Sequence, residues 1–404
     1  MLIAARLGAL EEREFRLLWL GQATSAIGTS LVPVALAFAV IELTGSASTL
    51  GIVLSAGLVS RVVLLLFGGV VADRLPRHTV MLAADLLRTA SQGTVAALLI
   101  TGHAQIWHLV ILFALFGAGD AFFSPASTGL VPDTVRAERL QQANALMSLS
   151  RSLAWVAGPT ISGLLVVGVG PGWVFAIDAA TFAVSSASLA LLRLPRVLDA
   201  LPRSSVLADL RGGWREVRRR TWVWTTVVRF GISNLAIAPI FVLGPFVAQE
   251  SLGGATAWGL IGTAGGVGAV VGDAVALRLR LPRPLFAGGL AVSLLALEPA
   301  LLARPAPTWA IAVAAAAGFG AVSFSNAVWF TALQERIPRE ALSRVSSYDW
   351  LGSIVFQPAG YALAGPVSAA IGIPATLLAG AALHASACVG VALTPEIRGL
   401  KRPG

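Results

Sequence analysis

Charged residues are scarce in this sequence, which has 404 residues of which only 12% are charged and 56% are hydrophobic. A soluble protein of this length needs charge across its whole surface, so this balance argues against an ordinary soluble protein. The mean hydropathy of +0.80 agrees with that exclusion. We therefore expect a chain that is solvated mainly by lipid.

Cysteine and histidine are scarce as well, and this removes several kinds of site. The single cysteine, Cys388, excludes an internal disulfide framework and a cysteine metal site. The four histidines are scattered, without a metal-binding spacing such as HExxH, and the sequence has neither a Gly-x-Ser-x-Gly motif nor a nucleotide-binding loop. We expect no enzymatic activity, no metal and no cofactor. A receptor or scaffold is disfavoured because the chain has no sizeable polar domain.

Long apolar runs, in contrast, fill most of the chain. A bilayer core about 30 Å thick needs about 20 apolar residues in a helix, and the period-two alternation of a membrane barrel is absent. The sequence therefore predicts an all-α membrane protein. Twelve runs are long enough to span: residues 17–41, 48–72, 79–101, 106–128, 143–167, 172–193, 222–247, 256–279, 284–303, 308–331, 346–367 and 373–394.

The arginines predict how these spans are oriented. They gather in the even-numbered connections and near both termini, whereas Arg304 is the one basic residue in the odd-numbered connections. By the positive-inside rule, both termini and the long middle connection face the cytoplasm. The net charge of +9 is then explained by orientation, and no nucleic-acid partner is expected. The run Arg218–Arg220 reads as an inside charge cluster, with binding of anionic lipid headgroups as the alternative.

The two halves of the chain repeat one plan. The motif at residues 68–73 (GGVVAD) has a counterpart at 268–273 (GAVVGD), and each closes the second span of its half. We predict an N-terminal six-helix bundle at 1–193, a cytoplasmic linker at 194–221 and a C-terminal six-helix bundle at 222–404. Parallel halves that flank a midplane site and rock about it form a known transporter plan.

The connection after the second span, GGVVADRLPR, combines small and charged residues. Gly68 and Gly69 let two helices approach closely, while Asp73 leaves the bilayer beside Arg74 and Arg77. A carboxylate there can bond the positive N-terminus of a neighbouring helix while one side of the protein is closed. The alternative is a polar loop that obeys the positive-inside rule.

These residues resemble the signature between the second and third spans of the major facilitator superfamily, with matches at Gly69, Asp73, Arg74 and Arg77. The resemblance continues at Gly21-Gln22, Ala84-Asp85-Leu-Leu-Arg88, Phe123-Ser-Pro-Ala126, Asp178-Ala-Ala-Thr-Phe182 and Val328-Trp329 to Pro338. It implies the major facilitator fold, twelve transmembrane helices in two pseudo-symmetric six-helix bundles, with alternating access.

The branch that these motifs resemble contains drug and siderophore exporters, including enterobactin and macrolide exporters. The resemblance implies export of small amphipathic molecules such as drugs, antibiotics, secondary metabolites or siderophores, driven by a proton gradient. We expect a monomer in the inner membrane of a bacterium. The main rival is an importer or uniporter of a sugar or organic ion on the same fold.

A Gly-Pro pair in the fifth span bears on the direction of transport. Gly158, Pro159 and Gly163 resemble the antiporter motif Gly-Pro-x-x-Gly-Gly, with Ser162 in place of one glycine. Pro159 removes one helix hydrogen bond, which favours a bend or pivot. In the family this motif accompanies proton-coupled export, and a packing kink is the alternative.

Ionisable residues inside the spans are costly and are candidates for proton coupling. Asp120 and Asp178 are the first candidates and Glu298 the third, against the alternative of permanently paired structural acids. Arg151 is expected to pair with Asp120. Arg61 binds either an anionic substrate group or one of these carboxylates.

For three further charged residues the sequence predicts a more specific role. Asp85 and Arg88 lie three residues apart, which predicts a structural ion pair on one helical face. Asp349 is expected to cap a helix or act as an inner-gate partner. The residues expected to line a substrate cavity are Gln22, Phe38, Asn234, Phe241, Asn326, Trp329 and Phe356.

Overall fold

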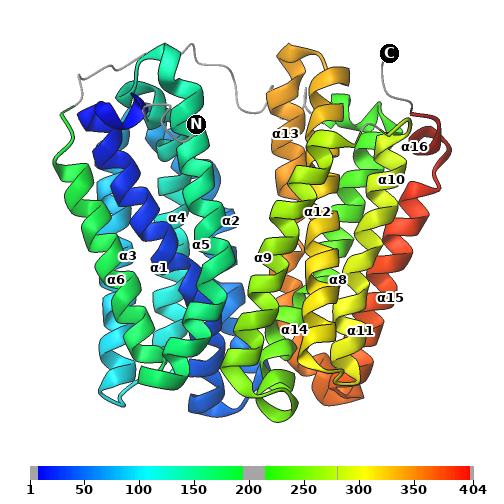
Figure 1. Ribbon diagram of the computed structural model, residues 1–404, viewed down its shortest axis with the longest axis horizontal. Helices are drawn as coiled ribbons and strands as arrows, with labels where there is room; N and C mark the ends of the chain where they lie inside the picture. Colours follow the sequence, from blue (N-terminus) through cyan, green and yellow to red (C-terminus); the bar gives the residue numbers. More distant parts are fainter. Residues whose placement is uncertain (1–7, 194–213, 280, 401–404) are drawn as a thin grey trace, which may run out of the picture. The chain divides into compact units, whose positions relative to one another are not determined.

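The computed structural model describes residues 8–193, 214–279 and 281–400 (Figure 1). The chain divides into two compact units, Met1–Ala200 (unit 1) and Leu201–Gly404 (unit 2). Every regular element in the described ranges is helical. Most of the predicted linker, residues 194–213, lies outside the described residues.

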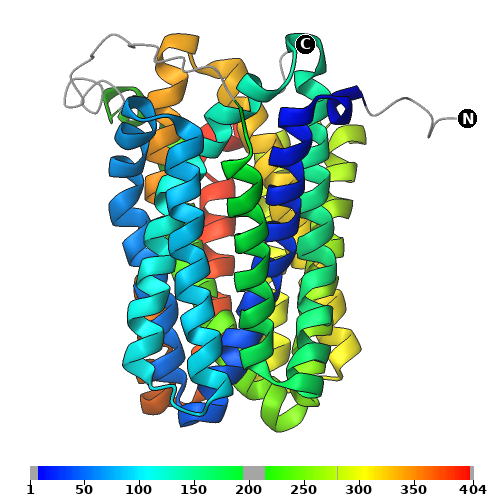
Figure 2. The same ribbon diagram turned by 90° about the vertical axis from the view of Figure 1, so that its left-hand side faces the viewer.

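Unit 1 contains six long helices, α1 to α6. Their bounds are α1 Arg13–Thr44, α2 Ala47–Arg74, α3 Arg77–Ile100, α4 Ile106–Leu130, α5 Leu140–Val169 and α6 Pro171–Ala190. In Figure 2, α6 lies between α3 and α1, and α1 lies between α6 and α5, in agreement with their packing. Short 3₁₀ segments, Gly8–Glu11, Val131–Thr134 and Ala137–Arg139, lie at one end of the bundle.

Tight turns join these helices because local residues satisfy the helix ends. α1 ends at Thr44, where Gly45 adopts the left-handed conformation (φ +60°) that a residue with a Cβ atom disfavours. The next residue, Ser46, caps α2 by accepting a hydrogen bond from the backbone N–H of Thr49 at 3.4 Å. The chain therefore reverses within two residues.

Unit 2 repeats this plan with two interrupted spans. Its helices are α8 Thr221–Ser251, α9 Gly254–Arg278, α10 Pro284–Ala291, α11 Leu297–Ala303, α12 Thr308–Arg336, α13 Arg339–Ile354, α14 Gln357–Ile371, α15 Ile373–Ala392 and α16 Pro395–Gly399. A 3₁₀ segment, Val292–Ala296, joins α10 to α11 within one span.

Prolines account for both interruptions. Pro299 has no N–H to donate to the carbonyl four residues earlier, which belongs to the 3₁₀ segment Val292–Ala296. Pro358 likewise leaves the carbonyl of Ile354 without a helical donor, and α13 ends at Ile354. The ninth and eleventh spans are therefore each built from two helical pieces.

The twelve predicted spans match these segments. Within the described residues, eleven helical stretches are long and apolar enough to cross a membrane. The twelfth, α3, is not among them because it carries Asp85, Arg88 and Gln92 within its length. The bounds agree to within a few residues, with the largest difference at α13, which begins at Arg339 whereas the predicted span begins at 346.

Within each unit, glycines bring one pair of helices into close contact. α2 packs along α4 in unit 1, and α9 packs along α12 in unit 2. A Cβ atom on Gly117 would lie 2.0 Å from the carbonyl oxygen of Gly57, and one on Gly268 would lie 2.0 Å from that of Ala316. Gly68 packs in the same way against Ala121, as the sequence predicts.

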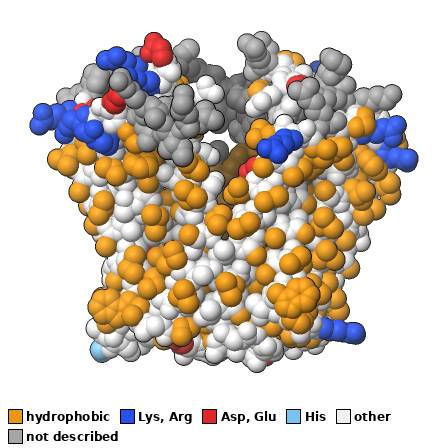
Figure 3. Space-filling view, viewed as in Figure 1, with side chains coloured by type: hydrophobic (Ala, Val, Ile, Leu, Met, Phe, Trp, Pro, Cys, Tyr) orange, Lys and Arg blue, Asp and Glu red, His pale blue; other side chains and the backbone are white. Residues whose placement is uncertain are grey.

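Basic residues gather at one end of each unit, and apolar side chains cover the wall between the two ends (Figure 3). In unit 1 the connections at the other end, residues 45–46, 101–105 and 170, contain no arginine or lysine. In unit 2, Arg304 is the exception that the sequence shows. Arginines stand at the opposite ends of these helices: Arg13, Arg74, Arg77, Arg136, Arg139 and Arg193 in unit 1, and Arg220, Arg278, Arg283, Arg336 and Arg398 in unit 2.

Candidate functional site

A buried ion pair in unit 1 joins two residues of α3. The Arg88 guanidinium donates to Asp85 across a very short contact, and the pair is 5% and 0% exposed. Ser185 of α6 donates its hydroxyl to the other Asp85 oxygen at 2.6 Å. Burying a charge is costly unless it is paired and hydrogen-bonded, and here both conditions hold. The predicted structural pair is confirmed.

Asp120 of α4 extends this pair into a network. Its carboxylate lies 2.9 Å from Arg61 Nε and 3.6 Å from Arg88. Of the two roles open for Arg61, the geometry therefore supports anchoring a carboxylate. The predicted pair of Asp120 with Arg151 is wrong: Arg151 is exposed on α5 and forms no ion pair with a described residue, because α4 packs on α2 and α3.

Aromatic rings complete the surroundings of Arg88. Its guanidinium carbon lies 4.0 Å from the centre of the Phe123 ring and 4.6 Å from that of Phe182. Such cation–π contacts stabilise a cation that has left water. Arg88 is thus held by two carboxylates and two rings, which is the arrangement of a fixed structural group.

Asp178 of α6 forms no ion pair with a described arginine, although Arg88 is near enough to act on it electrostatically. It is fully buried, and its Oδ2 accepts a hydrogen bond from Gln92 Nε2 at 2.6 Å. The other oxygen, Oδ1, is buried without a hydrogen-bond partner among the described residues. It faces Gly28, where a Cβ atom would approach it to 2.6 Å. Asp178 is therefore a membrane-depth carboxyl group with no charged partner in contact.

The Gly-Pro motif lies within α5, which continues through Pro159 from Leu140 to Val169. Gly158 packs against α1 so closely that a Cβ atom would lie 2.1 Å from Ser30 Oγ. Ser162 donates its hydroxyl to the carbonyl of Leu31 at 2.6 Å. The serine that replaces a motif glycine thus bonds the α1 backbone, and Gly163 beside it is buried.

The predicted gating motif is described in part. Arg77 donates to the carbonyl of Gly129 at 2.7 Å and lies 3.6 Å from Asp133, so it ties α3 to the end of α4. Arg74 is exposed at the end of α2. The side chains of Gly69 and Asp73 lie outside the described residues.

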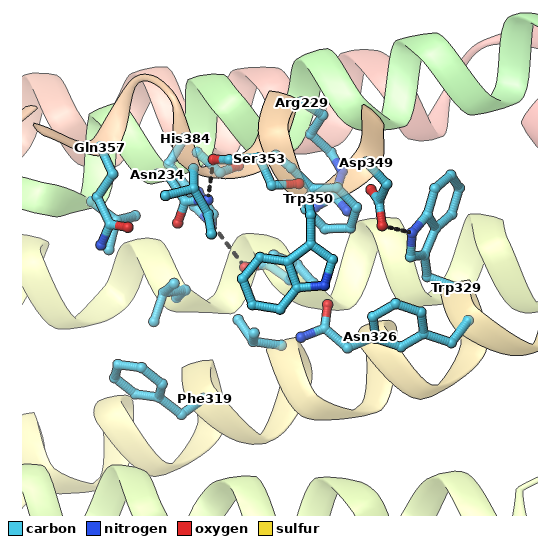
Figure 4. A pocket seen from close by; sticks show the side chains of 18 of the residues that line it. Arg229, Asn234, Phe319, Asn326, Trp329, Asp349, Trp350, Ser353, Gln357 and His384 are labelled. Atoms are coloured by element: carbon cyan, nitrogen blue, oxygen red, sulfur yellow. Dashed lines mark hydrogen bonds between the residues drawn. The ribbon is translucent and has the colours of Figure 1, made fainter. Parts of the chain in front are cut away.

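Unit 2 contains a partly open cavity of about 350 Å³, lined by α8, α12, α13, α14, α15 and the broken ninth span (Figure 4). Four predicted cavity residues line it, namely Asn234, Phe241, Asn326 and Trp329. The other three do not line it: Phe356 is exposed outside this cavity, and Gln22 and Phe38 belong to unit 1, where Phe38 is only 4% exposed.

Polar cavity residues on three spans were missed by the prediction, beginning with Arg229 and Ser233 on the seventh span. Asp349, Ser353 and Gln357 line the cavity from the eleventh span, and Trp350 and His384 line it as well. The spacing of four residues from 349 to 353 to 357 forms a polar stripe in an apolar span and would have revealed this face. Asp349 lies inside α13, so its predicted role as a helix cap is wrong, and it accepts a hydrogen bond from Trp329 Nε1 at 3.0 Å.

His384 ties α15 to the interrupted ninth span. Its Nε2 lies 2.9 Å from the carbonyl oxygen of Val292, the first residue of the 3₁₀ segment. A backbone carbonyl at a helix break needs a donor that the helix does not supply. The Cys388 thiol lies one turn further along α15, 3.7 Å from His384 and 3.8 Å from Arg229.

Glu298 is a buried acid of unit 2. It is 2% exposed at the start of α11, and its Oε2 has no hydrogen-bond partner among the described residues. No ion pair of a described residue involves it. It therefore resembles Asp178 in being a buried carboxyl group without a contacting cation.

A family model for the Major Facilitator Superfamily matches residues 18–355. The chain belongs to this superfamily. Consistent with this assignment, it is a multi-pass membrane protein with the major facilitator fold, and the members of the family are transporters of small molecules. The predicted family and fold class are confirmed.

Curated relatives are efflux proteins and exporters from bacteria. The chain is 28% identical to the multidrug efflux pump Tap of Mycolicibacterium fortuitum, over 88% of this chain and 89% of that protein. It is 29% identical to the enterobactin exporter EntS of Shigella boydii, over 88% and 85%. It is 24% identical to macrolide efflux protein A of Streptococcus pyogenes, where the match spans only 60% of each chain.

Solved structures support the fold. The nucleoside transporter NupG superposes with a TM-score of 0.73 at 12% identity, covering 94% of this chain and 98% of that one. A bacterial homologue of the human lysosomal transporter Spinster superposes with a TM-score of 0.66 at 15% identity, covering 94% and 93%. At these identities the likeness concerns the fold alone.

Proposed function

We propose that this protein exports small amphipathic organic molecules, such as drugs, antibiotics, secondary metabolites or siderophores, by proton antiport with alternating access. The observation that carries the proposal is the cavity in unit 2, in which aromatic and aliphatic walls surround a few polar groups. Such a lining suits an amphipathic ligand, with polar groups that fix its orientation. Relatives named as an efflux pump and an exporter, each matched over most of its length, support the outward direction.

Proton coupling needs a carboxyl group that gains and loses a proton without breaking the structure. Protonation of Asp120 would break its ion pairs with Arg61 and Arg88. Asp178 and Glu298 have no contacting cation among the described residues, so neither would lose an ion pair. We therefore favour Asp178 and Glu298 over Asp120 as proton carriers.

The orientation follows from the basic ends of the two units. By the positive-inside rule these ends face the cytoplasm of a bacterial inner membrane. Introduced cysteines test this: Glu138→Cys, at the basic end of unit 1, should react only from the cytoplasmic side, and Ala104→Cys only from outside. The native Cys388 is buried and should stay silent. Labelling of both positions from one side would refute the topology.

Export is tested in everted vesicles from a strain that lacks its own pumps. A panel of drugs and siderophores should include compounds that the vesicles accumulate when a proton gradient is imposed, and the same strain should show resistance to them. At least one of the two variants Asp178→Asn and Glu298→Gln should abolish or strongly reduce gradient-driven accumulation.

Glu138→Gln, at an exposed site, is the matched control and should transport normally. Uptake into intact cells down a solute gradient, without dependence on protons, would contradict export. It would instead favour an importer or uniporter of a small solute.

A further inference from the structure

Arg229 of α8 is a buried cation without a carboxylate in contact. It is 3% exposed, and its contacts among the described residues are the Cys388 thiol at 3.8 Å and the Phe230 ring at 4.3 Å. A sulfur atom is a weak acceptor, and one ring cannot replace a counter-charge. Asp349 attracts this guanidinium electrostatically but forms no ion pair with it. The guanidinium therefore lacks an anionic hydrogen-bond acceptor in direct contact, and a ligand in the cavity would supply one.

The position of Arg229 lets such a partner reach it, because its side chain lines the unit 2 cavity. Ser233 lies one helical turn further along α8 and lines the same wall, so a hydroxyl donor stands beside the guanidinium. In Figure 4, Arg229, Asp349 and Trp329 lie toward one end of the cavity, whereas Gln357 and Phe319 lie toward the other. The cavity thus has an end with charged side chains and an end where aromatic side chains stand beside uncharged polar ones.

Asp349 shares the charged end but does not neutralise Arg229 by contact. Its carboxylate accepts from Trp329 Nε1, and no ion pair joins it to Arg229. Like charges repel strongly where water is excluded. A fixed carboxylate there disfavours a ligand that brings two negative charges. A single anionic group in direct contact with Arg229 lies closer to the guanidinium than Asp349, which forms no ion pair with it, so its attraction outweighs that repulsion.

We propose that the Arg229 end of this cavity binds the single anionic oxyacid group of the transported molecule, such as a carboxylate or sulfonate. The apolar, aromatic body of that molecule lies along Phe241 and Phe319. The inference rests on the proposed function, because it takes the cavity as the substrate site. It narrows the substrate class from amphipathic molecules in general to aromatic monoanions, and a volume of about 350 Å³ suits a small organic molecule.

Three probes with one naphthalene body and different heads test the proposal: 1-naphthaleneacetate, 1-naphthaleneethanol and 1-naphthalenemethylamine. Equilibrium dialysis of the purified full-length protein measures their affinities. The acetate should bind about tenfold or more tightly than the alcohol, since a charge-assisted hydrogen bond is stronger than a neutral one. Arg229→Gln should remove this preference, and Arg229→Lys should retain part of it.

Arg151→Gln is the control, because Arg151 is exposed in unit 1, and it should leave the ranking unchanged. The order of the three probe affinities in the wild-type protein tests the anion site even if Arg229→Gln fails to fold. Tightest binding of the amine, with loss in Asp349→Asn, would overturn the proposal and assign a cation site. Equal binding of all three probes, or binding of none, would overturn it as well.

Transport of the same probes separates this inference from the proposed function. Selective binding of the acetate without its proton-driven accumulation in everted vesicles would contradict export and leave the anion site standing. Proton-driven accumulation of the amine in the same vesicles, with no accumulation of the acetate, would contradict the anion site and leave export standing.

Discussion

In unit 1, Arg88 lies between two carboxylates and two aromatic rings, whereas Arg229 in unit 2 lies between a thiol and one ring. Both arginines are buried within helices of equivalent bundles. The units therefore share a backbone plan but differ in how they compensate charge. A charge with an opposite charge in contact stabilises one structure. A buried charge beside a cavity, without an opposite charge in contact, can bind a ligand or exchange a proton.

The largest expected effect is on stability, and it tests directly whether Arg88 and Arg229 differ in their partners. Arg88→Met should lower the free energy of unfolding by about 3–5 kcal/mol, because it leaves Asp85 buried without its cation. Arg229→Met should leave stability unchanged or raise it, because no ion pair is lost. Thermal unfolding of the two purified variants in detergent measures both. A comparable loss in Arg229→Met would show that Arg229 has a structural partner after all.

An effect of intermediate size should be alike in the two units, because it depends on the shared helix crossing. Gly117→Ala and Gly268→Ala each force a methyl group against a backbone carbonyl, and each should cost about 1–3 kcal/mol. Gly390→Ala, where nothing lies within 4 Å, is the control and should be neutral. Unfolding in increasing concentrations of a denaturing detergent measures the stability of the three variants relative to the wild type. A loss in one unit only would contradict the equivalence of the α2–α4 and α9–α12 contacts.

The smallest expected effect again separates the units. Ser185→Ala removes a 2.6 Å hydrogen bond to buried Asp85 and should cost about 1 kcal/mol or slightly more. Ser233→Ala removes only a contact with Cys388 Sγ at 3.9 Å, so its stability should match that of the wild type. The melting temperatures of the two variants, each compared with that of the wild type, test this difference. Equal shifts would mean that the hydroxyl of Ser185 contributes no more than that of Ser233.

Several site residues could be predicted from the sequence because their partners are local. The Asp85–Arg88 pair follows from a spacing of three residues on one helix. The partner of Asp120 could not be found in this way, since the choice between Arg151 and Arg61 depends on which helices α4 touches. The ranking of Asp120 above Glu298 as a proton carrier had the same weakness: contacts across helices, absent from the sequence, decide which acid is paired.

The sequence by itself determined the twelve spans, the basic ends of the helices and the close approach at Gly68. These features depend on local properties, namely apolar length, charge and the absence of a side chain. Only the tertiary structure decided that Arg61 and Arg88 share Asp120, that His384 bonds the broken ninth span and that Arg229 faces a cavity. Those outcomes depend on how helices distant in sequence pack against one another, and an apolar pattern leaves that choice open because lipid and helix interior are equally apolar.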